Sequence, residues 1–132
     1  MQARYLALAF FEYWRECVSR VLWDPLRDED PATAGPYGGG GLYFMDGTAK
    51  PATAAFRFAF VALKGRNGKL TLWGRAPRSG RATIERDVGG VWRAVAHLRT
   101  TAGGIFYAVR RMSSAGPLRA QLGSDTSPAW QP

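Results

Sequence analysis

The apolar residues of this chain change their spacing near residue 69, and that change constrains the fold more than any other feature. Upstream, apolar residues recur three or four positions apart, as on one face of a helix. Downstream, short alternating runs are separated by turns that contain glycine. These runs cover residues 70–73, 82–86, 92–98, 105–110 and 118–122. With no helical pattern between them, they predict a small antiparallel β-sandwich or barrel.

The first half predicts two helices with a short apolar strand between them. An apolar stripe predicts a helix over residues 2–16, and a second stripe that begins at Pro51 predicts another over residues 51–60. Residues 20–23 end in a continuous apolar run, which is typical of a parallel strand covered on both faces. Residues 24–41 form a loop, because prolines and four successive glycines prevent regular structure. The predicted fold class is therefore α+β.

Charge divides the chain in the same way. Residues 1–63 carry six Lys or Arg and seven Asp or Glu, a net charge of −1. Residues 64–132 carry twelve Lys or Arg and three Asp or Glu, a net charge of +9. We therefore expect two units, residues 1–63 and residues 64–132. A strongly basic unit is compatible with polyanion binding, and an arginine-rich strand surface that is only solvated gives the same composition.

Cysteine and histidine usage limits the available chemistry. The single Cys17 excludes an internal disulfide and, at the end of an apolar helix, is expected to be buried as a small hydrophobe. The single His97 has no Cys or His companions, so no zinc site and no other cofactor is expected. Residues 5–11 are apolar but too short to cross a membrane, and no small-residue cleavage site follows them. No membrane partner is expected.

The first half also contains a series of short sequence words. They are Tyr5-Leu6, Trp14-Arg15, Val18 to Trp23, Leu26 to Asp28, Gly41 to Phe44, Asp46 to Ala52 and Phe56 to Phe58. Together they resemble the C-terminal end of TIM-barrel glycoside hydrolases of the cellulase and β-xylosidase type, bacterial members above all. The second half resembles a small β-sandwich appended to such enzymes. Its words are Leu72 to Gly74, Ser79 to Glu85 and Gly90 to Arg93.

The resemblance implies a partial (β/α) barrel end, helix–strand–helix, followed by a small antiparallel β-sandwich. Residues 2–16 would be the seventh helix of the barrel, residues 20–23 its eighth strand and residues 51–60 its eighth helix. The chain departs from the family at Cys17, where relatives usually carry the glycine that helix ends prefer. It also departs at Asp24-Pro25, where relatives usually carry an aromatic and a polar residue. The resemblance implies an extracellular protein whose secretion signal lies upstream of this chain.

By the same resemblance, this chain would hold no catalytic residue. Retaining glycosidases use two carboxyl groups about 5–5.5 Å apart, and in this family both follow strands that would precede Met1. The expected partners are the missing N-terminal part of the barrel and, through the complete barrel, a β-linked glycan. Trp23 would form the floor of the sugar subsite, and Tyr37 could approach the same cleft. A plain core tryptophan is the alternative for Trp23.

The acidic loop offers a rival source of chemistry. Asp24, Asp28, Glu29 and Asp30 could act as catalytic or calcium-binding carboxylates. Their spacing does not match the helix–loop–helix calcium pattern. A solvated acidic loop is the favoured interpretation.

The second half offers a rival function: a basic all-β module that binds an acidic polysaccharide or nucleic acid. Nine arginines between residues 75 and 119 accompany Trp73, Trp92 and Tyr107. No recognised nucleic-acid motif is present, so nucleic acid is not the favoured partner. An accessory sandwich that packs against the barrel is the competing interpretation.

Overall fold

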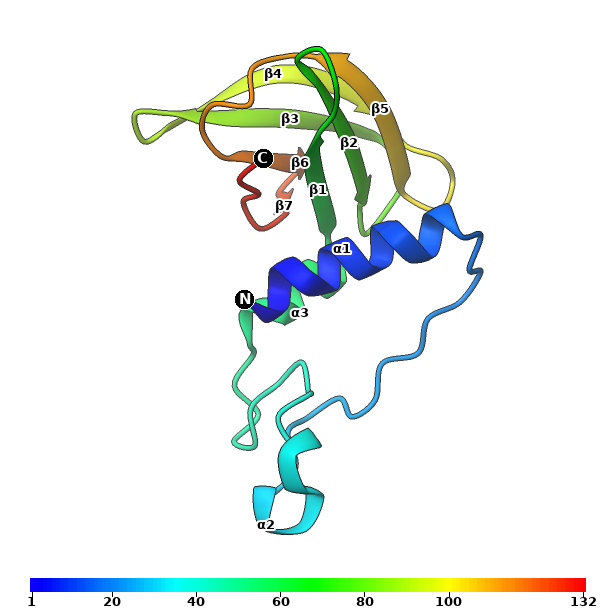
Figure 1. Cartoon of the computed structure of the whole chain (residues 1–132), viewed down its shortest axis with the longest axis vertical. Coiled ribbons are helices and arrows are strands. Elements are labelled where there is room, and N and C mark those ends of the chain that lie inside the picture. The colour runs from blue at the N-terminus through cyan, green and yellow to red at the C-terminus, as the bar shows by residue number, and fades with distance from the viewer.

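The computed structural model describes residues 1–132 with the exception of the Tyr37 side chain, and it shows an α+β fold. Helices occupy the N-terminal part and strands the C-terminal part, as Figure 1 shows. The helical elements are α1 (Gln2–Arg15), α2 (Pro31–Ala34), the 3-10 turn η1 (Gly35–Tyr37) and α3 (Pro51–Arg57). The strands are β1 (Ala59–Lys64), β2 (Lys69–Arg75), β3 (Arg81–Val88), β4 (Val91–Arg99), β5 (Ile105–Arg111), β6 (Leu118–Leu122) and β7 (Asp125–Thr126).

The strands form two antiparallel sheets with the orders β1-β2-β5 and β4-β3-β6-β7. Each of the five strands predicted from alternation is present, as β2 to β6. An irregularity between Ile84 and Glu85 shifts the register of β3 against β4. Both sheets contribute to one hydrophobic core, in which Leu72, Phe106 and Leu118 are fully buried. The antiparallel all-β part of the prediction is therefore confirmed.

Helix α1 packs on the outer face of the first sheet. The strand β2 alternates, so that Leu70 and Leu72 point into the core while Trp73 points towards α1. The rings of Phe11 and Trp73 lie 5.8 Å apart, centroid to centroid, and bury that face. Helix α3 lies beside α1 (Figure 1), with a contact between Phe10 and Phe56. Helix α1 thus joins the helical part to the sheets.

The end of α1 corrects one prediction. The amide of Cys17 donates to the carbonyl of Trp14 and the amide of Val18 to that of Tyr13, the hydrogen-bond pair of a Schellman motif. Cys17 takes the left-handed position of this motif, with φ +58°. Its side chain is exposed rather than buried. The expectation of a buried cysteine was wrong because this cysteine stands outside the last helical turn, where glycine is the usual residue.

Two further predictions in the first half differ from the structure. Residues 20–23 lie in no strand, and the chain passes from α1 to the loop in an irregular path. The helix predicted over residues 51–60 ends at Arg57, and β1 begins at Ala59. Residues 59–64 become a strand because β2 offers a complete hydrogen-bonding partner, with Val61 opposite Trp73. A barrel end is not shown by this structure.

The expected boundary between Leu63 and Lys64 falls within β1. Residues 59–63 belong to the same sheet as the second half, since β1 pairs with β2 along its whole length. Whether either unit folds alone stays a prediction. Over the part of the chain that the structure describes, no helix combines the length and the apolar character needed to span a membrane.

Candidate binding site

Trp23 anchors the glycine-rich loop instead of ending a strand. Its indole Nε1 donates a hydrogen bond to the carbonyl of Gly40 at 3.1 Å, and its ring is partly buried against the core. The Nε2 amide of Gln2, at the start of α1, donates to the carbonyl of Gly41 at 3.2 Å. Trp23 and Gln2 therefore hold this loop against α1. Tyr37, the other residue predicted for a sugar site, has a side chain that lies outside the described part of the structure.

The loop is organised around a buried ion pair between Asp28 and Lys50. The Nζ of Lys50 lies 2.6 Å from Oδ1 of Asp28 and 2.9 Å from the carbonyl of Gly39. The same carboxylate oxygen accepts a bond from the amide of Gly41 at 2.9 Å. An added Cβ at Gly41 would lie 2.5 Å from the backbone of Arg27 and Asp28, so only glycine fits there. Asp28 is thus occupied by a structural role.

The other acidic side chains do not converge on a metal site. Asp30 caps α2 by accepting from the amide of Ala32 at 2.8 Å. Among the described residues, no three His, Cys, Asp or Glu side chains are grouped as metal ligands would be. Asp46 accepts a hydrogen bond from the backbone amide of Thr48, which lowers the pKa of this exposed carboxyl. Each of these bonds stabilises a local turn.

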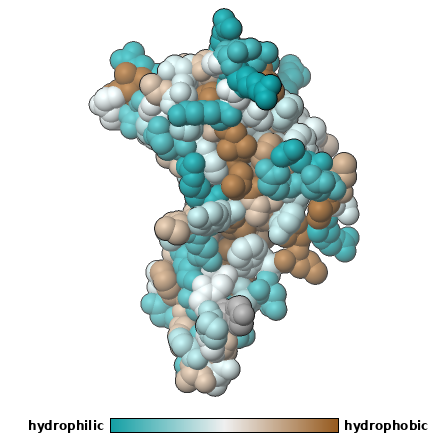
Figure 2. Space-filling model, viewed as in Figure 1, coloured by the Kyte–Doolittle hydropathy of each residue, from teal (hydrophilic) through white to brown (hydrophobic). Residues whose placement is uncertain are grey.

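The segment between α1 and the loop exposes apolar side chains. Leu22 is 86% exposed, and Val18 and Leu26 are also exposed. Figure 2 shows a hydrophobic patch on the flank along which this segment runs in Figure 1. Within the described part of the chain, the backbone of residues 19–25 makes no hydrogen bond to other backbone groups. The backbone of this irregular segment is therefore available for strand-type hydrogen bonds.

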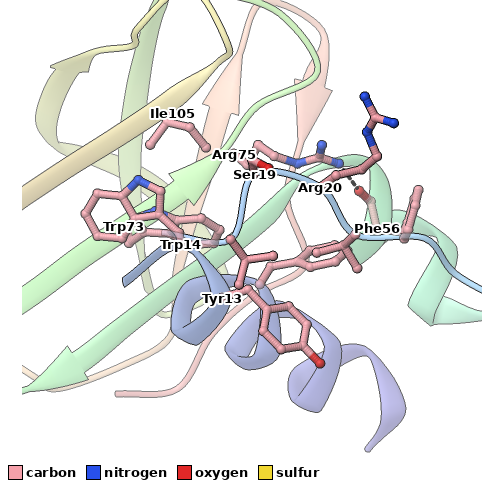
Figure 3. Close-up of a pocket in the computed structure, with 11 residues that line it drawn as sticks. Tyr13, Trp14, Ser19, Arg20, Phe56, Trp73, Arg75 and Ile105 are labelled. Atoms are coloured by element: carbon pink, nitrogen blue, oxygen red, sulfur yellow. Dashed lines mark hydrogen bonds between the residues drawn. The ribbon is translucent and has the colours of Figure 1, made fainter. Parts of the chain in front are cut away.

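A pocket of about 260 Å³ lies between α1, the segment 18–21 and the outer face of the first sheet. We call it the α1–β2 pocket, and Figure 3 shows its lining. Five aromatic residues line it: Phe10, Tyr13 and Trp14 from α1, Phe56 from α3 and Trp73 from β2. The rings of Trp14 and Trp73 lie 6.0 Å apart in a tilted arrangement. The aromatic walls come from three elements that are distant in the sequence.

The charged side chains of the α1–β2 pocket are both cationic. Arg75 and Arg20 line it (Figure 3), and no Asp or Glu does. The Nη2 of Arg75 donates to the carbonyl of Phe56 at 3.0 Å, and its guanidinium carbon lies 5.4 Å from the centre of the Phe10 ring. No carboxylate lies within ion-pair distance of either arginine in the described structure. The pocket therefore combines aromatic walls with uncompensated positive charge.

Trp73 lines this pocket, and its indole Nε1 is buried. Trp73 is only 1% exposed, and its buried Nε1 has no hydrogen-bond partner among the described residues. Buried polar groups in proteins are rarely left unpaired, and an unpaired one calls for an explanation.

Sequence reasoning did not find this pocket, although it named Trp73 as an aromatic of the basic half. The apolar stripe over residues 2–16 includes Phe10 and Trp14, and a hydrophobic helix face is ordinarily core. Arg75 follows Trp73 at the alternate position of β2, so both project from the outer face of the sheet. That alternation is the only signal in the sequence that could have suggested the pair.

His97 has a simple place in the structure. Its Nδ1 lies 3.1 Å from Oγ1 of Thr83, its partner across β3 and β4, on an exposed strand surface. The structure therefore places His97 on the surface. It is not part of the α1–β2 pocket.

Comparison with known proteins adds no relative: no family model, no curated protein and no solved structure matches this chain.

Proposed function

We propose that this chain is the non-catalytic C-terminal part of an extracellular hydrolase of β-linked glycans. In this proposal, residues 1–58 complete a (β/α) barrel and the two sheets form an accessory sandwich packed against it. Carbohydrate is bound by the completed barrel, with Trp23 in the sugar subsite. The sequence words shared with barrel glycosidases support the assignment.

The observation that carries the proposal is the state of residues 19–25. An apolar segment with β-type composition normally pairs on both sides when it belongs to a parallel sheet. Here Leu22 is almost fully exposed and the neighbouring backbone is unpaired. Such a segment is stabilised when neighbouring strands supply hydrogen bonds and cover its side chains.

The arrangement of the helices and the carboxylates agrees with this proposal. Helices α1 and α3 pack side by side, as consecutive helices of a barrel do. Asp28, Glu85 and Asp125 are engaged in ion pairs with Lys50, Arg119 and Arg57. These three carboxylates therefore have structural partners. In this proposal, the catalytic pair belongs to the upstream part of the barrel.

The test is to determine the coding sequence directly upstream, express its product joined to this chain and assay hydrolysis of aryl β-glucosides and β-xylosides. We expect β/α units upstream and activity in the joined protein. Leu22→Asp should be nearly neutral in the isolated chain, within about 0.5 kcal/mol, yet should destabilise the joined protein. Val88→Asp is the matched control, because Val88 is an exposed apolar residue on β3. An upstream sequence without β/α units, or equal effects of both variants, would contradict the proposal.

A second candidate function rests on cationic side chains that face one another across strands. Arg81 lies opposite Arg99, and Arg86 lies opposite Arg93. Like charges placed directly opposite each other destabilise a sheet. In the described structure, none of these four arginines has an ion-pair partner. A bound polyanion would relieve the repulsion, and an acidic polysaccharide is the candidate that suits an extracellular protein.

This second function is tested by titrating the chain with an acidic polysaccharide at several salt concentrations. Binding to phosphate or sulfate backbones weakens steeply with salt because counterions are released. We expect Arg81→Gln with Arg99→Gln to weaken binding and to reduce its salt dependence. Equal or tighter binding to a DNA duplex would identify nucleic acid instead. Absence of binding at low salt would show that the surface is only solvated.

A further inference from the structure

The size of the α1–β2 pocket restricts what it can hold. Its volume of about 260 Å³ is below the range of roughly 300–1,000 Å³ that is typical of sites for drug-sized ligands. The walls are partly formed by fixed elements, since Phe10 and Trp73 are buried in the packing of α1 against β2. A single six-membered ring is therefore the scale of occupant that fits.

The polar groups of the pocket select the charge of that occupant. Arg75 is half-buried and uses one Nη2 bond on a backbone carbonyl, which leaves most of its donors without a charged acceptor. Arg20 lies on the segment at the mouth of the pocket. A carboxylate is the acceptor that matches guanidinium groups best, because the two oxygens accept parallel bonds from one planar fork.

The aromatic walls select the body of the occupant. Trp14 and Trp73 present two tilted indoles, and Phe10 and Phe56 lie on the same pocket. Aromatic faces provide a large apolar contact area with one polar handle. The C–H faces of a pyranose ring match such walls, while a ring carboxylate can reach the arginines. We propose that the α1–β2 pocket binds one carboxylate-bearing sugar ring, a uronate, with Arg75 and Arg20 on the carboxylate.

The choice of a sugar rests on the proposed function in β-glycan hydrolysis, whereas the requirement for an anion rests on the pocket alone. The site is separate from the subsite expected at Trp23, which does not line this pocket. Binding of a uronate would give the accessory part its own affinity for acidic side groups or acidic glycans. This role does not depend on an active barrel, so the two proposals can fail independently.

The experiment is a titration of the full chain with methyl β-glucuronide, followed by tryptophan fluorescence and calorimetry at constant ionic strength. Trp14 and Trp73 line the pocket, so an occupant should change their emission. The neutral methyl β-glucoside is the matched ligand, and benzoate tests a planar carboxylate without a sugar. We expect saturable glucuronide binding in the millimolar range or tighter. The glucoside should bind at least about tenfold more weakly, since it offers no charged acceptor.

Three variants connect the binding to the pocket. Arg20→Gln and Arg75→Gln should each weaken glucuronide binding by about tenfold, the size expected for one charge-assisted contact. Arg66→Gln makes the same change of charge in the exposed turn between β1 and β2, outside both the pocket and the paired arginines of β3 and β4, and should leave binding unchanged. Arg20 is exposed on an irregular segment, so its variant keeps the test valid even if Arg75→Gln unfolds. Thermal melts of each variant identify loss of fold.

The proposal fails on any of three results. The first is no glucuronide binding to the wild-type chain. The second is equal binding of glucoside and glucuronide, which would remove the role of the arginines. The third is an equal loss of binding in Arg66→Gln and Arg20→Gln, which would indicate general charge attraction. Tighter binding of benzoate than of glucuronide would keep the anion site and overturn the assignment to a sugar. Hydrolysis assays of the joined protein decide the proposed function separately.

Discussion

The ammonium of Lys50 lies 2.6 Å from the carboxylate of Asp28, and the side chains are only 8% and 13% exposed. Twenty-two positions separate them in the sequence. The ammonium of Lys50 also donates to the carbonyl of Gly39, and the carboxylate of Asp28 accepts from the amide of Gly41. These bonds hold the glycine-rich loop against the start of α3. The stability of this loop therefore depends on both charges being present.

Asp28→Ala should destabilise the chain strongly. The change leaves the Lys50 charge buried without a partner, and breaking a buried pair in this way costs about 3–5 kcal/mol. Denaturant unfolding measures the effect. Glu29→Ala, the exposed neighbouring carboxylate, should change the free energy of unfolding by no more than about 0.5 kcal/mol. Similar small effects of both variants would show that the ion pair adds nothing.

Cys17→Gly should stabilise the chain. Cys17 has φ +58°, and a non-glycine residue in this left-handed region costs roughly 1–2 kcal/mol. Glycine removes part of that cost, so we expect a gain of about 1 kcal/mol in the free energy of unfolding. Cys17→Ala is the control, because alanine keeps the strain and should give no gain. A gain from both substitutions would assign the effect to loss of the thiol instead.

The isolated chain should hydrolyse no aryl β-glucoside or β-xyloside. The expectation follows from the proposed location of the catalytic carboxylates upstream and from the structural pairing of Asp28 with Lys50. The assay compares wild type with Asp28→Asn and Glu29→Gln. Turnover that copurifies with the chain and disappears in either variant would overturn the assignment.

Trp23 should have a structural role that is separable from its proposed role in sugar binding. Trp23→Phe keeps an aromatic face but removes the bond to Gly40, so the isolated chain should lose about 1 kcal/mol of stability. In the protein joined to its upstream part, Trp23→Ala should weaken sugar binding by about 1 kcal/mol or more. Unchanged sugar affinity in that variant would mean that Trp23 is only part of the core.

The all-β part should fold without the helices. The structure indicates that the chain is best divided before Ala59 and not before Lys64. A piece from Ala59 keeps β1, which pairs with β2 along its whole length, whereas a piece from Lys64 loses this edge strand. We expect residues 59–132 to melt cooperatively and at a higher temperature than residues 64–132. Residues 1–58 should not fold alone, because Phe11 packs against Trp73. Circular dichroism melts check each piece. A cooperative, monomeric melt of residues 1–58 would contradict the division.

Local patterns explain which elements could be predicted. Strands β2 to β6 carry alternating side chains between turn glycines, and alternation records which face of a strand meets the core. Helix α1 has a clear apolar stripe, and its predicted end at residue 16 differs from the observed end by one residue. In these elements one face is buried and the other is not, so apolar residues recur in the sequence with the period of the helix or strand.

The sequence pattern did not predict strand β1, because this strand is buried on both faces. Its inner side joins the core and its outer side lies under α1, so Ala59 to Ala62 are all apolar and carry no alternation. Continued from α3, the same residues extend a helical stripe, and length alone could not separate the two interpretations. These residues form a strand because they pair with β2, and this pairing depends on the tertiary structure.

The sequence by itself therefore determined the antiparallel strands, the first helix and the excess of positive charge in the second half. Tertiary structure alone decided the Asp28–Lys50 pair, the exposure of Cys17 and the α1–β2 pocket. The physical reason is that period and composition report how each residue meets solvent, whereas a site requires particular side chains from distant segments to meet each other. Phe10 and Arg75 lie sixty-five positions apart, and only the packing of α1 on β2 brings the ring and the guanidinium within 5.4 Å.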